Sequence, residues 1–163
     1  MEDKEFTPPP RQCEGCTACC EGWLSGEALG KRFFPGQPCH WMSCNGCTIY
    51  EDRPSLCTDF SCAWISNHFL PEWFKPTESN AITRWQTWKD IDECTPEDRG
   101  GVYLVVLETG GKIKHNCMTW LTNYASAGML NVKYQLEGRW HWMGSDSFTQ
   151  WCANGSAAAA KPQ

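Results

Sequence analysis

The sequence predicts an α+β protein, in which an irregular, metal-stabilised, cysteine-rich N-terminal module is followed by a small α+β domain with a C-terminal β-hairpin. Two observations predict this class. Nine of the twelve cysteines lie between residues 13 and 62, among many turn-forming glycines and prolines and without a long helical or strand period. From about residue 78 onward, strand and helix periods appear instead. A segment of the first kind needs cross-links, and metal ions are the expected ones.

Changes in composition divide the chain into four parts. Residues 1–12 are polar, contain three consecutive prolines and are expected to form a flexible lead-in. Residues 13–77 are the expected cysteine-cluster metal-binding module, and residues 78–153 the small α+β domain. Residues 154–163 (NGSAAAAKPQ) are of low complexity and are expected to form a disordered tail.

Two strands and one helix are predicted in the first part of the α+β domain. Residues 80–88 are expected to form a strand, and the apolar run 102–108 a second strand that ends before a Gly-Gly turn. A helix follows, because the apolar residues recur at i, i+3, i+4 and i+7: Cys117, Trp120, Leu121 and Tyr124. Gly128 is well placed to end this helix.

A β-hairpin is predicted next. Residues 132–136 alternate apolar and polar side chains, and so do the residues around Trp140 and Trp142. Glu137-Gly138 stands between the two runs and suits a two-residue turn. One side of this hairpin, with its tryptophans, is therefore expected to face a core.

The composition limits the classes of function. The net charge is -5, and no basic run of five or more residues occurs, so we expect no nucleic-acid binding. The start, MEDKEFTPPPRQ, has no apolar core of a secretion signal, and no apolar run approaches the roughly 20 residues that span a bilayer. We expect a soluble, cytoplasmic protein with no membrane association. In that reducing compartment clustered cysteines favour metal ligands over disulfides.

The cysteine spacing is typical of thiolate metal sites. The first group reads Cys13-x2-Cys16-x2-Cys19-Cys20, and the second includes Cys39, Cys44 and Cys47 and is followed by Cys57 and Cys62. Two cysteines separated by two residues can turn both sulfurs toward one ion. Nine cysteines exceed one tetrahedral site, so two sites or one polynuclear site are both open. Zinc, iron and an iron–sulfur cluster all suit thiolate ligands and are not distinguished.

The pattern CxxCxxCC at residues 13–20, a spaced Cys39, the run CTIYEDRPSLC at residues 47–57, then Phe60 and Cys62 resembles a bacterial cysteine-cluster family. That family is described as a zinc- or iron-chelating domain, and a related segment occurs in flagellin lysine N-methylases. The resemblance covers about residues 13–64. It implies metal binding by Cys13, Cys16, Cys19, Cys20, Cys39, Cys47, Cys57 and Cys62, with Cys44 as an extra cysteine that can replace a ligand or remain a free thiol.

Two further side chains are expected around the ligands. Arg53 can offset thiolate charge with its planar fork of donors, and Tyr50 can pack over the cluster and shield it from water. The alternative for Arg53 is a surface ion pair with Glu51 or Asp52. His40 is a weaker ligand candidate.

Three other cysteines carry no signature of catalysis. Cys117 is expected to pack as a small hydrophobic residue, and Cys94 and Cys152 are isolated. The leading hypothesis is a metal-binding accessory protein, which either holds the metal for transfer or uses a metal-stabilised module to bind a protein partner. The alternative is a metal- or iron–sulfur-dependent enzyme acting on a protein or peptide; no catalytic residue is identified, and the oligomeric state stays open.

Overall fold

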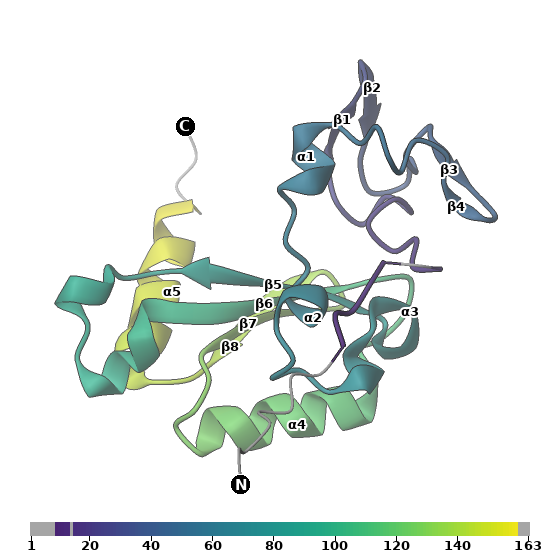
Figure 1. Cartoon of the computed structure of the whole chain (residues 1–163). Coiled ribbons are helices and arrows are strands. Elements are labelled where there is room, and N and C mark those ends of the chain that lie inside the picture. The colour runs from purple at the N-terminus through teal and green to yellow at the C-terminus, as the bar shows by residue number, and fades with distance from the viewer. Residues whose placement is uncertain (1–8, 14, 160–163) are drawn as a thin grey trace, which may run out of the picture.

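The structure, a computed structural model, describes residues 9–13 and 15–159. Its centre is a four-stranded sheet in the order β5-β6-β7-β8. The strands are β5 (Ala81–Thr87), β6 (Val102–Glu108), β7 (Val132–Leu136) and β8 (Arg139–Met143) (Figure 1). β5 and β6 are antiparallel, whereas β6 and β7 are parallel and are connected through helix α4 (His115–Ser126). The α+β class, the helix and both predicted strands are confirmed.

The predicted hairpin is β7 and β8. Leu136 pairs with Arg139, so Glu137 and Gly138 form the two-residue turn. Their φ angles are 51° and 75°, as the mirror-image turn that matches the twist of a hairpin requires. The sheet continues with β6 on the other side of β7, so the hairpin is one edge of a larger sheet.

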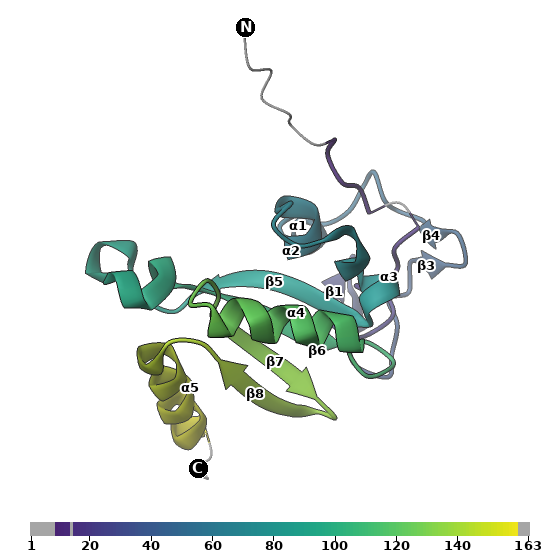
Figure 2. The ribbon, with the colours of Figure 1, turned by 90° about the horizontal axis from the view of Figure 1, so that it is seen from below.

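Helix α4 covers one face of the sheet, as Figure 2 shows from below. Alternate residues of a strand point to opposite faces, and Leu104 and Val106 of β6 point to this one. Both are fully buried, together with Cys117 and Leu121 of the helix. Burial raises the pKa of the Cys117 thiol to about 11, so this cysteine packs as the small hydrophobic residue that the sequence predicted.

Helix α5 (Asp146–Ala159) packs on the opposite face. There Tyr103 and Val105 of β6 contact Phe148 and Cys152 of the helix, and Trp142 packs beside them. Trp140 is 41% exposed. Only part of the tryptophan side of the hairpin therefore reaches a core.

The connection between β5 and β6 contains two 3-10 helices, η2 (Ile91–Glu93) and η3 (Pro96–Gly101). Hydrogen bonds to Asp98 stabilise this connection. The buried Asp98 carboxylate accepts hydrogen bonds from Lys89 Nζ at 2.7 Å, from the Thr95 backbone N–H at 2.8 Å and from Ser147 Oγ at 2.8 Å. These donors, Lys89 first, hold the pKa of Asp98 well below its usual range. The carboxylate ties α5 to the β5–β6 connection.

The N-terminal third consists of short elements: β1 (Gly26–Ala28) with β2 (Lys31–Phe33), β3 (Met42–Ser43) with β4 (Gly46–Cys47), and α1 (Ser55–Thr58). Next come α2 (Ala63–Ser66), η1 (Glu72–Phe74) and α3 (Pro76–Ser79). Ala63, Leu70 and Phe74 belong to the core under α4. Packing therefore crosses the boundary expected at residue 77, and we call residues 13–61 the cysteine module and residues 62–159 the sheet domain.

The C-terminal prediction needs correction. Helix α5 runs to Ala159, so a disordered tail starting at residue 154 is wrong for residues 154–159, and a helix follows the hairpin. The alanine run read as low complexity is also the strongest helix-forming sequence available. Residues 160–163 lie outside the described residues. No helix in the described part of the chain is long and apolar enough to cross a bilayer.

The flexible lead-in needs correction near its end. The guanidinium of Arg11 donates to the carbonyl oxygens of Trp64 and Leu70, each at 2.7 Å, and to Glu72 at 2.8 Å. It also lies 5.0 Å from the Trp64 ring. Arg11 therefore fixes the chain to the sheet domain, while residues 1–8 lie outside the described part.

Candidate metal centre

Tight turns bring the cysteine groups toward each other. The Cys16 N–H donates to the Cys13 carbonyl at 2.8 Å across a turn in which Gly15 has φ of 69°. This is a left-handed conformation that glycine adopts without a steric cost. The Cys39 N–H donates to the Cys20 carbonyl at 2.7 Å. That bond joins the first cysteine group to the second, although they are far apart in the sequence.

Two short helices present the last two cysteines. Pro54 precedes α1, and its carbonyl accepts a hydrogen bond from the Cys57 N–H at 2.8 Å. Cys62 precedes α2, and its sulfur is a hydrogen-bond acceptor for the backbone N–H groups of Trp64 and Ile65. These two bonds offset part of the effect of burial, which raises the pKa of Cys62.

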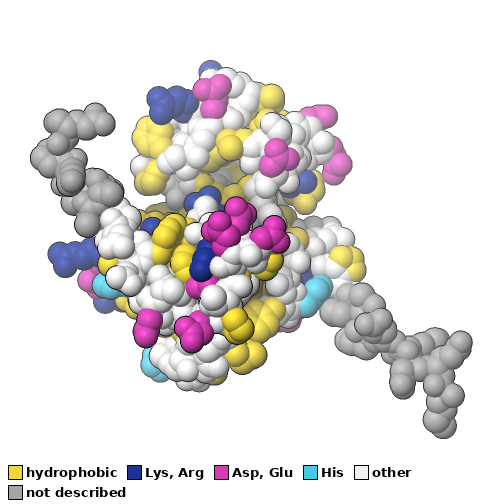
Figure 3. Space-filling model, turned by 90° about the vertical axis from the view of Figure 1, so that its left-hand side faces the viewer, with side chains coloured by type: hydrophobic (Ala, Val, Ile, Leu, Met, Phe, Trp, Pro, Cys, Tyr) yellow, Lys and Arg dark blue, Asp and Glu magenta, His cyan; other side chains and the backbone are white. Residues whose placement is uncertain are grey.

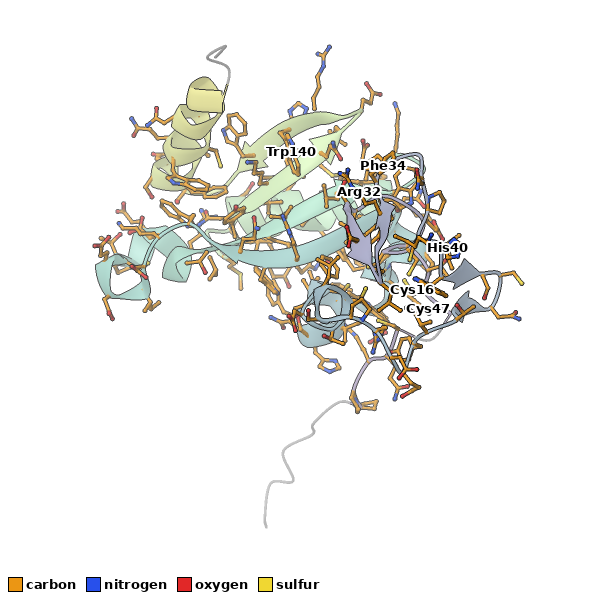
Figure 4. The ribbon with its side chains drawn as sticks, turned by 90° about the horizontal axis from the view of Figure 1, so that it is seen from above. Cys16, Arg32, Phe34, His40, Cys47 and Trp140 are labelled. Atoms are coloured by element: carbon orange, nitrogen blue, oxygen red, sulfur yellow. The ribbon has the colours of Figure 1, made fainter. Side chains whose placement is uncertain are left out.

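One cavity of about 1160 Å³ lies between the cysteine module and the sheet domain. In Figure 3 it corresponds to the recess between the upper lobe, which is the cysteine module, and the lower one. Figure 4 shows Cys16 and Cys47 in the cysteine module beside the β1–β2 hairpin. All eight cysteines of the expected ligand set line the cavity: Cys13, Cys16, Cys19, Cys20, Cys39, Cys47, Cys57 and Cys62.

The thiols divide into two neighbourhoods. Burial, and then the nearby Cys62, Cys16, Cys20 and Cys13, raise the pKa of Cys19 far above its ordinary value. Burial, and then Cys47, Cys39, Cys57 and Cys16, raise the pKa of Cys20 to about 12. We assign Cys13, Cys16, Cys19 and Cys62 to a first neighbourhood, and Cys20, Cys39, Cys47 and Cys57 to a second. The two neighbourhoods adjoin, since Cys20 also acts on Cys19 and Cys16 also acts on Cys20.

The sulfurs surround the cavity without converging on one point. Within residues 9–13 and 15–159, no three metal-ligating side chains form a group that could hold a metal ion as they stand. The eight cysteines that line the cavity are free thiols. Since burial and mutual repulsion raise several of their pKa values, they cannot all ionise together unless positive charge enters the cavity.

The structure places Tyr50 and Arg53 beside the thiols. The Tyr50 side chain hydrogen-bonds to Cys13, and the Arg53 charge acts on both Cys13 and Cys57; these interactions lower thiol pKa values that burial raises. Arg53 is held in place by its Nε donating to the Tyr50 carbonyl at 2.7 Å, with its guanidinium 3.6 Å from the Tyr50 ring centre. Among the described residues it forms no ion pair with Glu51 or Asp52.

The remaining candidates lie elsewhere. Cys44 is exposed and is not part of the cavity lining. His40 is also exposed, and its ring packs edge-on against Trp41 (Figure 4). Cys94 lies after η2, where its thiol donates to the Asp90 carbonyl, and Cys152 of α5 is buried against the sheet.

Sequence reasoning missed the wall of the cavity that the sheet domain provides. Arg84 of β5 and Leu107 of β6 line it, and so does Trp64. No local signal identifies these residues, since Arg84 reads simply as a polar residue in a strand. Only the packing of the cysteine module over the sheet brings them to the thiols.

No protein-family model, no curated protein and no solved structure matches this chain. The resemblance to the cysteine-cluster family stays a prediction that rests on the motif residues.

Proposed function

We propose that this protein is a metal-binding accessory protein, whose cavity holds zinc or iron through the eight cysteines that line it. The observation that carries the proposal is the selective placement of cysteines around one cavity. Eight cysteines spread over residues 13–62 line one cavity, while the exposed Cys44 does not. A cysteine that binds no metal has no need to lie at this cavity.

The two thiol neighbourhoods support two tetrahedral sites. Each contains four cysteines, the number that fills a closed zinc or iron–thiolate site. Cys19 and Cys20 are adjacent in the chain yet belong to different neighbourhoods, so they would bind different ions. A small inward movement of the turns would close each group, because metal binding and folding are coupled in such segments.

Arg53 and Tyr50 complete the proposed centre. Two sites of four thiolates would each retain negative charge after a divalent ion is bound, and Arg53 stands beside a thiol of each neighbourhood to offset it. Closed thiolate sites leave no coordination position for a substrate. This favours metal storage, metal transfer or a metal-stabilised surface for a protein partner over catalysis at the ions.

The proposal is tested by elemental analysis and absorption spectroscopy of anaerobically purified protein. We expect two metal ions per chain in the wild type and in Cys44→Ser, the matched control. Cys16→Ser and Cys47→Ser each disrupt one neighbourhood and should retain about one ion. Iron with inorganic sulfide and broad visible absorption would assign an iron–sulfur centre, whereas colourless zinc would assign closed sites. Metal-free wild-type protein, or equal loss from Cys44→Ser, would refute the proposal.

A further inference from the structure

Arg84 is the feature that a metal centre leaves unexplained. It lies in edge strand β5, paired with Val105, so its side chain leaves the sheet on the same face as Val105 and Leu107. Arg84 and Leu107 line the cavity from the sheet domain, whereas most of the lining comes from the cysteine module. A cation thus lines the same cavity as the thiols.

The guanidinium has an unused donor. Arg84 Nε is buried and has no hydrogen-bond partner, and among the described residues no carboxylate forms an ion pair with Arg84. A buried donor without an acceptor is costly, and a charged one more so. Nε and a neighbouring Nη of arginine form a planar edge that receives both oxygens of a carboxylate.

The position of Arg84 separates it from the cation that serves the thiols. Arg53 acts on Cys13 and Cys57, as described above. The charge of Arg84 instead acts on Tyr103, a residue of the sheet, where it partly offsets the burial that raises the tyrosine pKa. Tyr103 itself donates to Gln86 at 2.7 Å, and Arg84 Nε has no acceptor.

The rest of the wall is largely apolar. Besides Arg84 and the cysteines, apolar side chains of both regions line the cavity: Leu24, Phe33, Leu56, Phe60, Ile65 and Leu107. Small-molecule sites have this composition, an apolar enclosure with few polar groups that fix the orientation. A single arginine edge suits a planar carboxylate, whereas a phosphate dianion calls for more donors.

We propose that Arg84 binds the carboxylate of an organic acid, with the apolar body of that acid held in the cavity between the sheet and the cysteine cluster. This site goes beyond the proposed metal centre. The ligand carboxylate satisfies Arg84 Nε, and its apolar part covers Leu107 and its neighbours. The thiols line the same cavity, so a bound acid shares it with the metal centre.

The experiment follows the arginine Nε–H resonances of the full chain by ¹H–¹⁵N NMR during titration with hexanoate. Hexanamide, of the same shape without charge, and inorganic phosphate are the comparison probes. We expect a saturable shift of the Arg84 signal with hexanoate only. Arg84→Gln should weaken hexanoate binding at least about tenfold. Arg84→Lys keeps the charge without the planar edge, so its hexanoate affinity should lie between those of the wild type and Arg84→Gln. Arg32→Gln, a change at an exposed arginine, should leave hexanoate affinity unchanged.

Any of four results would overturn the proposal. The Arg84 signal shifts without saturating, hexanamide binds as tightly as hexanoate, phosphate binds as tightly as hexanoate, or Arg84→Gln keeps the hexanoate affinity of the wild type. Each titration is run on metal-loaded and on metal-free protein, and the metal content of Arg84→Gln is measured. If Arg84→Gln loses hexanoate binding and keeps its full metal content, the result agrees with both proposed sites. Hexanoate binding to a protein that never retains metal would refute the metal centre alone.

Discussion

Among the described residues of the cysteine module, only Ala18, Ala28 and Phe33 are buried hydrophobic side chains other than cysteine, whereas the sheet domain buries two faces of a four-stranded sheet. The module contributes seven of the eight cysteines in the cavity wall instead, and Cys62 lies just after it. Burial of apolar area contributes about 25 cal/mol per Å². The sheet domain can therefore fold by hydrophobic burial, and the cysteine module depends on another source of free energy.

This difference shows how two parts of one chain can respond to different perturbations. The sheet domain should be sensitive to lost packing and indifferent to chelators. The cysteine module should be sensitive to chelators and indifferent to lost packing in the sheet domain. Changes at the junction, where Arg11 and residues 62–76 lie, should affect both.

The largest effect expected is that of metal removal, which rests on the proposed metal centre. Structural zinc contributes about 10–16 kcal/mol of apparent binding free energy in small zinc-dependent peptides. We expect a chelator to abolish amide-exchange protection in residues 15–61, while β6 and α4 keep theirs. Hydrogen exchange with mass spectrometry measures both regions in one sample. If amide-exchange protection survives in the metal-free cysteine module, the module does not depend on metal and does not differ from the sheet domain in this respect.

The next effect is the reverse experiment, Leu104→Ala. Leu104 is fully buried between β5, β7 and α4, so the cavity left behind should destabilise the sheet domain by about 3 kcal/mol. Val102→Ala is the matched control, since Val102 is 41% exposed on the same strand and should cost below about 1 kcal/mol. Denaturant unfolding and metal analysis together test this: we expect lower stability with unchanged metal content, and coupled loss of metal would contradict independence of the two regions.

A smaller effect is expected at the junction. Arg11→Ala removes two hydrogen bonds to the carbonyls of Trp64 and Leu70 and a contact with the Trp64 ring, at a cost of about 2 kcal/mol. Thermal unfolding measures the loss, and exchange should rise in residues 62–76 first. Arg32→Ala, at an exposed arginine, is the control and should change stability by less than about 0.5 kcal/mol. Equal effects of the two substitutions would show that Arg11 is not an anchor.

The smallest effect is a stabilisation at the hairpin turn. Glu137 has φ of 51°, which asparagine adopts more readily, while its bridge to Lys112 joins two exposed side chains and contributes little. Glu137→Asn should therefore raise the free energy of unfolding by about 0.5 kcal/mol. Glu137→Ala loses the bridge without the conformational gain and should be slightly destabilising. Denaturant midpoints of the two variants measured side by side decide between these outcomes.

The elements that the sequence predicted well are those with a local cause. Strand Val102–Glu108, helix α4 and the Glu137-Gly138 turn follow from apolar periodicity and from backbone preferences of single residues. The prediction failed at residues 154–159, because an alanine-rich run is compatible with both low complexity and a helix. Packing of Phe148 and Cys152 on β6 selects the helix.

The sequence by itself determined which cysteines are ligand candidates, since spacing and turn residues are properties of the chain. Only the tertiary structure decided that eight of them line one cavity and divide into two groups, and that Arg84 and Leu107 form its other wall. The physical reason is distance along the chain. The parallel pairing of β6 with β7 and the seating of the cysteine module over β5 join residues that no local pattern connects, and their free energy comes from burial that only the assembled fold provides.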